Sequence, residues 1–111
     1  PYVVISEKCI QQRRFGRVQK EFLWEEVYPS LSIKTSDYLP VTVRFNYLCC
    51  ARYQVDTAEF AKRGYGFWRD NPNVIIFFLS NKNYERFTKF YKGEVDNFEN
   101  ALYDLHLYKS K

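Results

Sequence analysis

The chain has 111 residues, a net charge of +4 and a pI near 9.0, and it carries ten Tyr and ten Phe. This length predicts a single domain over residues 1–111, and the longest apolar run, residues 74–79, is too short for a transmembrane helix. The basic charge favours a polyanionic partner such as RNA, although a solvated basic surface would give the same balance.

The N-terminal half is predicted to form a strand, a long helix and a second strand. Residues 2–6 are apolar and β-branched, as in a strand. Residues 11–28 follow a helical period that Pro29 ends, and residues 30–40 are expected to form a polar connection. Apolar and polar side chains then alternate over residues 41–47, which predicts a half-buried strand.

The C-terminal half is predicted to contain a short helix, two strands and a final helix. The short helix is capped by Asp56 or Thr57 and ends at Gly64. Residues 74–79 are continuously apolar, as in a strand covered on both faces, and residues 84–92 are expected to pair with it as an antiparallel neighbour. The final helix begins after Asp96, whose side chain can cap it.

This order of strand, helix, strand, helix, strand, strand, helix predicts an α/β fold. We expect one small mixed sheet with helices on its faces, in a thioredoxin-like order. Because the long helix connects the first two strands, these strands are expected to be parallel neighbours.

Short motifs support this fold. Phe15-Gly16-Arg17-Val18, Phe22-Leu23-Trp24 and Pro29-Ser30-Leu31 precede the strand at residues 41–45, and Phe90-Tyr91-Lys92-Gly93 precedes the final helix. This arrangement resembles the thioredoxin-like domain that mitochondrial ribosomal proteins share with an accessory subunit of respiratory complex I.

The resemblance implies a mitochondrial, non-catalytic structural subunit that contacts rRNA and neighbouring proteins and needs no cofactor. The alternative that it leaves open is a protein–protein adaptor in a respiratory complex, without RNA contact. Outside the mitochondrion, the cysteine usage fits an intracellular reducing compartment.

The first candidate binding surface is the basic face of the predicted long helix. On a helical wheel its residues fall opposite the apolar face formed by Phe15, Val18 and Phe22. Arginine and lysine can neutralise phosphates, and an indole can stack on a base. The alternative is a solvated face on which Glu21 and Glu25 pair with the cations. The predicted RNA-binding residues of this face are Arg13, Arg14, Arg17, Lys20 and Trp24.

The second candidate is residues 62–69, in which basic side chains alternate with glycines and aromatic rings. Such interleaving is typical of segments that contact single-stranded RNA. The alternative is a turn that is packed by its own aromatic side chains. The predicted RNA-binding residues here are Lys62, Arg63, Tyr65, Phe67, Trp68 and Arg69.

The catalytic and metal-binding side chains are few, so we expect neither an enzyme nor a metal site. The cysteines are Cys9, Cys49 and Cys50, without a C-x-x-C pair, and His106 is the one histidine. A small thiol-dependent enzyme is the third alternative. It would require a cysteine with a lowered pKa, for which Arg52 is the nearest cation in the sequence.

Overall fold

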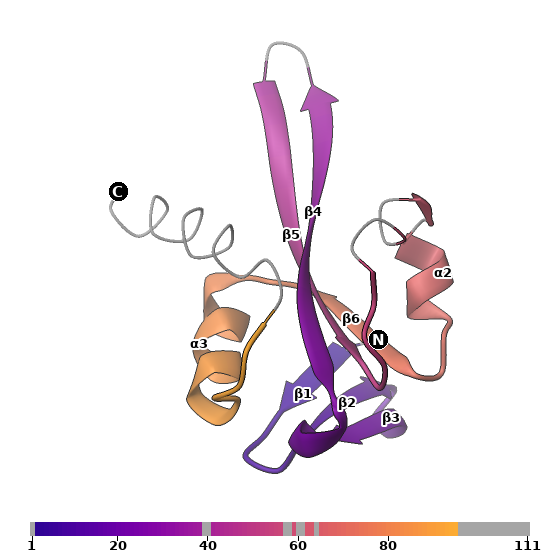
Figure 1. Ribbon diagram of the computed structural model, residues 1–111, viewed down its shortest axis with the longest axis vertical. Coiled ribbons are helices and arrows are strands. Elements are labelled where there is room, and N and C mark those ends of the chain that lie inside the picture. The colour runs from indigo at the N-terminus through magenta and orange to yellow at the C-terminus, as the bar shows by residue number, and fades with distance from the viewer. Residues whose placement is uncertain (1, 39–40, 57–58, 60–61, 64, 96–111) are drawn as a thin grey trace.

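The computed structural model describes residues 2–38, 41–56, 59, 62–63 and 65–95, and for residues 33–38, 41–45 and 65 it describes the backbone. The described chain is mostly β and forms two antiparallel three-stranded sheets (Figure 1). The first sheet contains β1 (Tyr2–Ile5), β2 (Cys9–Arg14) and β3 (Arg17–Leu23), and the second contains β4 (Tyr28–Tyr38), β5 (Val41–Ala51) and β6 (Val74–Phe78). A short 3₁₀ helix, η1 (Trp24–Glu26), joins the sheets, and the described α-helices are α2 (Tyr65–Arg69) and α3 (Asn81–Phe90).

The predicted thioredoxin-like α/β fold is therefore wrong. Neighbouring strands pair antiparallel throughout the described chain, and β1 pairs with β2 rather than with a strand beyond a crossover helix. The sheets also face each other, whereas the prediction had a single sheet covered by helices.

Residues 11–28, predicted as a helix, instead form most of the β2–β3 hairpin, η1 and the start of β4. Phe15 and Gly16 make a two-residue turn in which both residues have positive φ, 53° and 77°, as a type I′ hairpin turn requires. Ile10 and Phe22 pair across this hairpin, and both are buried against the second sheet. Pairing with β1 and burial of this pair favour the strand over the helical period.

A β-bulge lies close to the tip of the hairpin. Gln12 pairs with Lys20 but Arg13 pairs with Val18, so Gln19 is the extra residue on β3. Lys20 therefore points toward the second sheet, while Val18 lies beside Arg13 on the outer face. The bulge thus separates a structural lysine from the residues of the tip.

The two sheets pack face to face around one apolar core. β1, β2 and β3 contribute Ile5, Ile10 and Phe22, while Phe87 of α3 closes the side of this core. On the opposite face of the second sheet, Trp68 of α2 packs over the alternate residues of β5 and β6. β6 is thus covered on both faces, which confirms the strand predicted from the apolar run at residues 74–79.

Residues 84–92, predicted as an antiparallel strand, lie largely in α3. The Ser80 Oγ accepts a hydrogen bond from the backbone N–H of Asn83 at 3.2 Å, which caps the first turn of the helix. Phe87 is buried on the inner side, while Lys82, Arg86 and Lys89 are exposed. The helical period of these residues was not recognised, because an antiparallel neighbour of β6 was expected there.

The remaining predictions divide into confirmed strands and segments outside the described residues. The first strand corresponds to β1 and residues 41–47 lie in β5, whereas residues 30–40, expected to be a connection, mostly form β4. The final helix after Asp96 lies outside the described residues, as does most of the short helix between Asp56 and Gly64.

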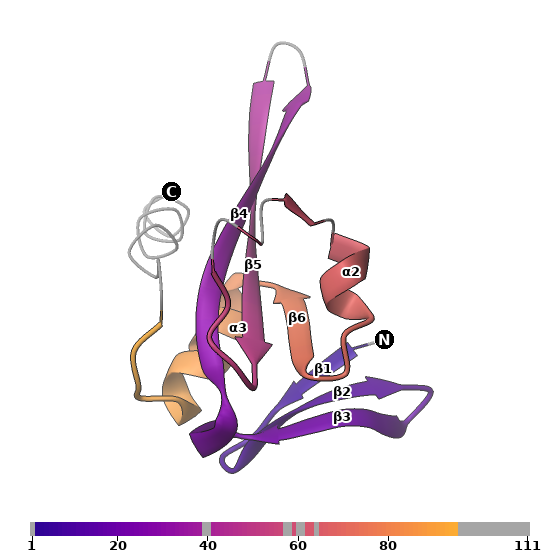
Figure 2. The ribbon, with the colours of Figure 1, turned by 45° about the vertical axis from the view of Figure 1, so that its right-hand side comes forward.

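The β4–β5 hairpin projects from the body. β6 pairs with residues 47–51 of β5, so the outer part of the hairpin is a two-stranded ribbon (Figure 1). Figure 2 shows that the turn between β2 and β3 and helix α2 lie on one side of the molecule, with α3 on the other. Among the described residues, no helix is long and apolar enough to cross a membrane.

Candidate nucleic-acid interface

The tip of the β2–β3 hairpin presents an aromatic ring between arginines. Phe15 is 90% exposed, and its neighbours Arg14 and Arg17 pair with each other across the turn and are exposed as well. The guanidinium carbon of Arg14 lies 5.4 Å from the centroid of the Phe15 ring. The turn thus holds one hydrophobic ring and two cations outside the folded body.

Arg13, which precedes Arg14 on β2, is held in place by hydrogen bonds. Its Nε donates a hydrogen bond of 2.8 Å to the Oε1 of Gln11, and the Nε2 of Gln11 donates in turn to the Oε1 of Glu21. Val18, its partner on β3, is 47% exposed. We call Arg13, Arg14, Phe15, Arg17 and Val18 the hairpin tip.

The charge of the hairpin tip is not neutralised by nearby acids. Within the described part of the chain, no acidic side chain forms an ion pair with Arg14 or Arg17. Glu21, the closest acidic residue along β3, is engaged with Gln11 and lies 3.9 Å from the Sγ of Cys9. The tip is therefore available to an anion.

Lys20, predicted to bind RNA, has a structural role. Its Nζ donates to the backbone carbonyl oxygens of Arg69, Asn71 and Val74 at 2.7, 2.8 and 2.8 Å. The ammonium thereby ties β3 to the C-terminal end of α2 and to the first residue of β6. Burial lowers the pKa of Lys20, and the negative charge of Asp70 partly opposes this shift.

Trp24, the aromatic residue of the same prediction, also belongs to the interior. Its Nε1 donates to the backbone oxygen of Ser6 at 2.8 Å. Its ring packs edge-on against Phe87, with the centroids 5.7 Å apart, and lies 5.8 Å from the ring of Tyr91. The structure thus gathers Arg13, Arg14 and Arg17 at one site but removes Lys20 and Trp24 from it.

The second predicted segment, residues 62–69, is only partly on the surface. Trp68 is 1% exposed and fills the smaller core, so it is a structural residue. Phe67 is 46% exposed, and the guanidinium carbon of Arg63 lies 4.3 Å from its centroid. The Nε of Arg69 donates to Asp70 at 3.2 Å. Lys62 is exposed, and the side chain of Tyr65 lies outside the described part of the structure.

The cysteine thiols of β5 are poor candidates for catalysis. Cys49 and Cys50 are both fully buried, and burial raises the pKa of Cys49 to about 12 and that of Cys50 well above its ordinary value. At neutral pH both are therefore protonated thiols rather than nucleophilic thiolates. In the part of the chain that the structure describes, no cluster of His, Cys, Asp and Glu side chains could hold a metal ion. His106 lies outside that part.

A second basic surface, which was not predicted from the sequence, lies on α3. The exposed face of α3 carries Lys82, Arg86 and Lys89, which follow the i, i+4, i+7 spacing of one helical stripe, and Lys92 follows the helix. That spacing was a usable signal, but it was overlooked because a strand was predicted there. The stripe lies on the other side of the molecule from the hairpin tip (Figure 2).

Comparisons with known proteins give no relative: no family model, no curated protein and no solved structure matches this chain.

Proposed function

We propose that this domain is a non-catalytic RNA-binding module that contacts RNA through the hairpin tip. The observation that carries the proposal is Phe15. A phenylalanine at φ 53° and 90% exposure is unfavourable for folding on two counts, because the left-handed conformation is strained and the ring gains nothing from burial. Asparagine and glycine are the residues that such a turn favours. A strained, exposed ring points to a role in binding.

The chemistry around the ring fits RNA. An exposed aromatic side chain can stack on an unpaired base, and the flanking arginines can neutralise the phosphates on either side. Arg14 approaches one side of the Phe15 ring, which leaves the other side for a base. Such a contact requires an unpaired segment, because bases inside an RNA duplex offer no free face.

The wider setting also remains a proposal. The resemblance to mitochondrial ribosomal proteins implied a thioredoxin-like domain, and the two-sheet fold does not have that architecture. Membership of a large ribonucleoprotein assembly with rRNA and protein partners therefore rests on the hairpin tip rather than on the resemblance. Co-sedimentation of the native protein with ribosomal particles would test this setting.

The proposal is tested by removing two charges from the tip. The variant Arg14→Gln/Arg17→Gln is compared with a matched control, Lys82→Gln/Arg86→Gln, which removes the same charge from the exposed face of α3. Binding of a fluorescent single-stranded 12-nucleotide RNA is followed by anisotropy between 50 and 300 mM salt, roughly the range over which phosphate contacts dominate affinity.

We expect the tip variant to bind more weakly and with a shallower dependence on salt. Losing two phosphate contacts lowers the slope of log K against log[salt] by about 1.4 for single-stranded RNA, while the control keeps most of the wild-type affinity. Equal losses in both variants would show general charge attraction instead. Binding to phosphatidylserine vesicles without binding to RNA would refute the proposal in favour of a lipid surface.

A further inference from the structure

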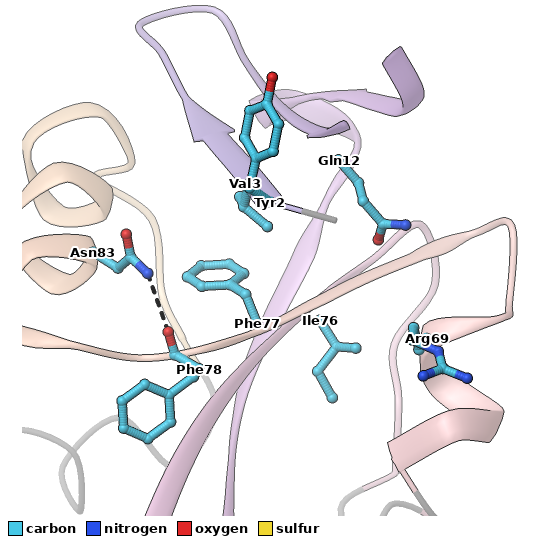
Figure 3. Close-up of a pocket in the computed structure, with 8 residues that line it drawn as sticks. All are labelled: Tyr2, Val3, Gln12, Arg69, Ile76, Phe77, Phe78 and Asn83. Carbon is cyan, nitrogen blue, oxygen red and sulfur yellow. Dashed lines mark hydrogen bonds between the residues drawn. The ribbon is translucent and has the colours of Figure 1, made fainter. Parts of the chain in front are cut away.

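A cleft lies between the first sheet and the edge of the second (Figure 3). It has a volume of about 370 Å³, which falls at the small end of ligand-binding pockets. β1 and β6 are each at one edge of their sheet, and together they supply most of the walls of the cleft. Its lining residues are Tyr2, Val3, Gln12, Arg69, Ile76, Phe77, Phe78 and Asn83.

Gln12 is the polar group that faces this cleft from the first sheet. It is only 8% exposed, and Figure 3 shows its amide directed into the space between β2 and Arg69. The Nε2 of Gln12 donates to the Oε1 of Gln19 at 3.3 Å, whereas no described residue donates a hydrogen bond to the Gln12 Oε1. The Gln12 Oε1 is therefore an accessible acceptor on an otherwise buried side chain, and a donor on a ligand can bond to it.

Two side chains oppose the addition of a peptide strand to the edge of β6. Lys20 donates to the carbonyl oxygen of Val74 at one end, and the Nδ2 of Asn83 donates to that of Phe78 at 3.1 Å at the other. Residues 75–77 lie between these two capped positions, and of them only Ile76 alternates with Val74 and Phe78 and so presents its backbone polar groups to the same edge. The edge is thus blocked against an extended peptide, and the cleft suits a compact ligand instead.

Gln12 places the cleft close to the hairpin tip along β2. Gln12 directly precedes Arg13 and lies three residues from Phe15, about 10 Å along the strand. Arg69 supplies a half-exposed guanidinium at the side of the cleft that faces α2. Val3, Ile76 and Phe77 provide apolar walls for a flat ring.

We infer that this cleft takes one unpaired base of the RNA strand whose backbone is held at the hairpin tip, and that Gln12 reads the edge of that base. This inference rests on the proposed function, since it assigns base selectivity to the same interface. The Gln12 Oε1 accepts a hydrogen bond from an amino or imino group of the base, while Phe15 and the arginines hold the strand regardless of its sequence.

The test compares three single-stranded homopolymers, rA12, rC12 and rU12, with wild type, Gln12→Leu and the control Gln54→Leu. Gln54 is exposed and lies away from the cleft residues in sequence. We expect wild type and the control to prefer one homopolymer by about fivefold, the size of one net hydrogen bond, and Gln12→Leu to bind all three alike. A wild type without preference, or a variant that keeps it, would overturn the inference.

A second measurement decides the matter even if Gln12→Leu does not fold. The ¹⁵N resonances of the wild-type protein are followed during titration with the homopolymer that binds most tightly. Shifts of the Gln12 side-chain amide together with Val3 and Ile76 support a base in the cleft. Shifts at Phe15 and Gly16 alone contradict the cleft but keep the proposed function, and the absence of any shift at the tip contradicts both.

Discussion

Lys20 offers the sharpest test of how the two sheets are held together. In the variant Lys20→Met the aliphatic stem is kept and the ammonium is lost, so the carbonyl oxygens of Arg69, Asn71 and Val74 lose their common donor. Val74 is fully buried, so water reaches its carbonyl poorly, while Arg69 is exposed. A hydrogen bond from a charged donor contributes about 1.5–3 kcal/mol, and in the variant water can replace only some of the three hydrogen bonds.

We therefore expect Lys20→Met to lower the free energy of unfolding by about 2–3 kcal/mol. For a domain of this size the corresponding fall in Tm is about 10 °C. Urea denaturation followed by circular dichroism would measure it, with an unchanged m-value. The matched control is Lys8→Met, at an exposed lysine, which should change stability by less than about 0.5 kcal/mol. If both variants lose the same stability, the three hydrogen bonds do not hold the sheets together.

Three further predictions concern the turn, the interior tryptophan and the buried thiols. Gly16→Ala places a side chain at φ 77° where no atom lies within 4 Å of the added Cβ, so it should cost about 1 kcal/mol of conformational strain in thermal unfolding; no loss would contradict the positive φ. Trp24→Phe removes the hydrogen bond to Ser6 and should lower the free energy of unfolding by about 1 kcal/mol, while the RNA affinity stays at the wild-type value. Weaker RNA binding by this variant would show that Trp24 contacts RNA after all. The unfolded Cys49 thiol ionises above about pH 9, whereas the folded thiol stays protonated up to about pH 12, so stability falls as the pH rises through this range. In Cys49→Ala the free energy of unfolding should fall less steeply with pH, by about 1.4 kcal/mol per pH unit, when it is measured by urea titration between about pH 9 and 10.5. An equal pH dependence in the wild type and the variant would refute this prediction.

Local patterns predicted the strands better than they predicted the fold. The apolar run at residues 74–79 and the alternation at residues 41–47 predicted β6 and the start of β5 without distant information, because each pattern is by itself typical of a strand. The helical spacing of Phe15, Val18 and Phe22 is present in the sequence, but the fold does not use it, since it buries Phe22 and leaves Phe15 and Val18 exposed. What decides the structure of this segment is pairing with β1 and the turn at Phe15 and Gly16. The wrong choice there replaced a hairpin with a crossover helix and so produced the wrong topology.

In the candidate site, too, local sequence predicted only the part whose residues are close together in the chain. Arg13, Arg14 and Arg17 are close in sequence, and any local structure would bring them near one another. Lys20 follows Arg17 by only three residues, but the bulge at Gln19 directs it to the backbone of β6. The cleft could not have been predicted at all, since its walls come from β1, β2, α2, β6 and α3.

The role of Phe15 in binding is tested most directly by the RNA affinity of Phe15→Asn. Asparagine suits a positive φ and a hairpin turn better than phenylalanine does, so the fold should be as stable as the wild type or more stable. Stacking on an aromatic ring is worth about 1–3 kcal/mol per base. We therefore predict at least about fivefold weaker binding of single-stranded RNA by a protein that melts no earlier. Unchanged affinity in this variant would contradict the central claim.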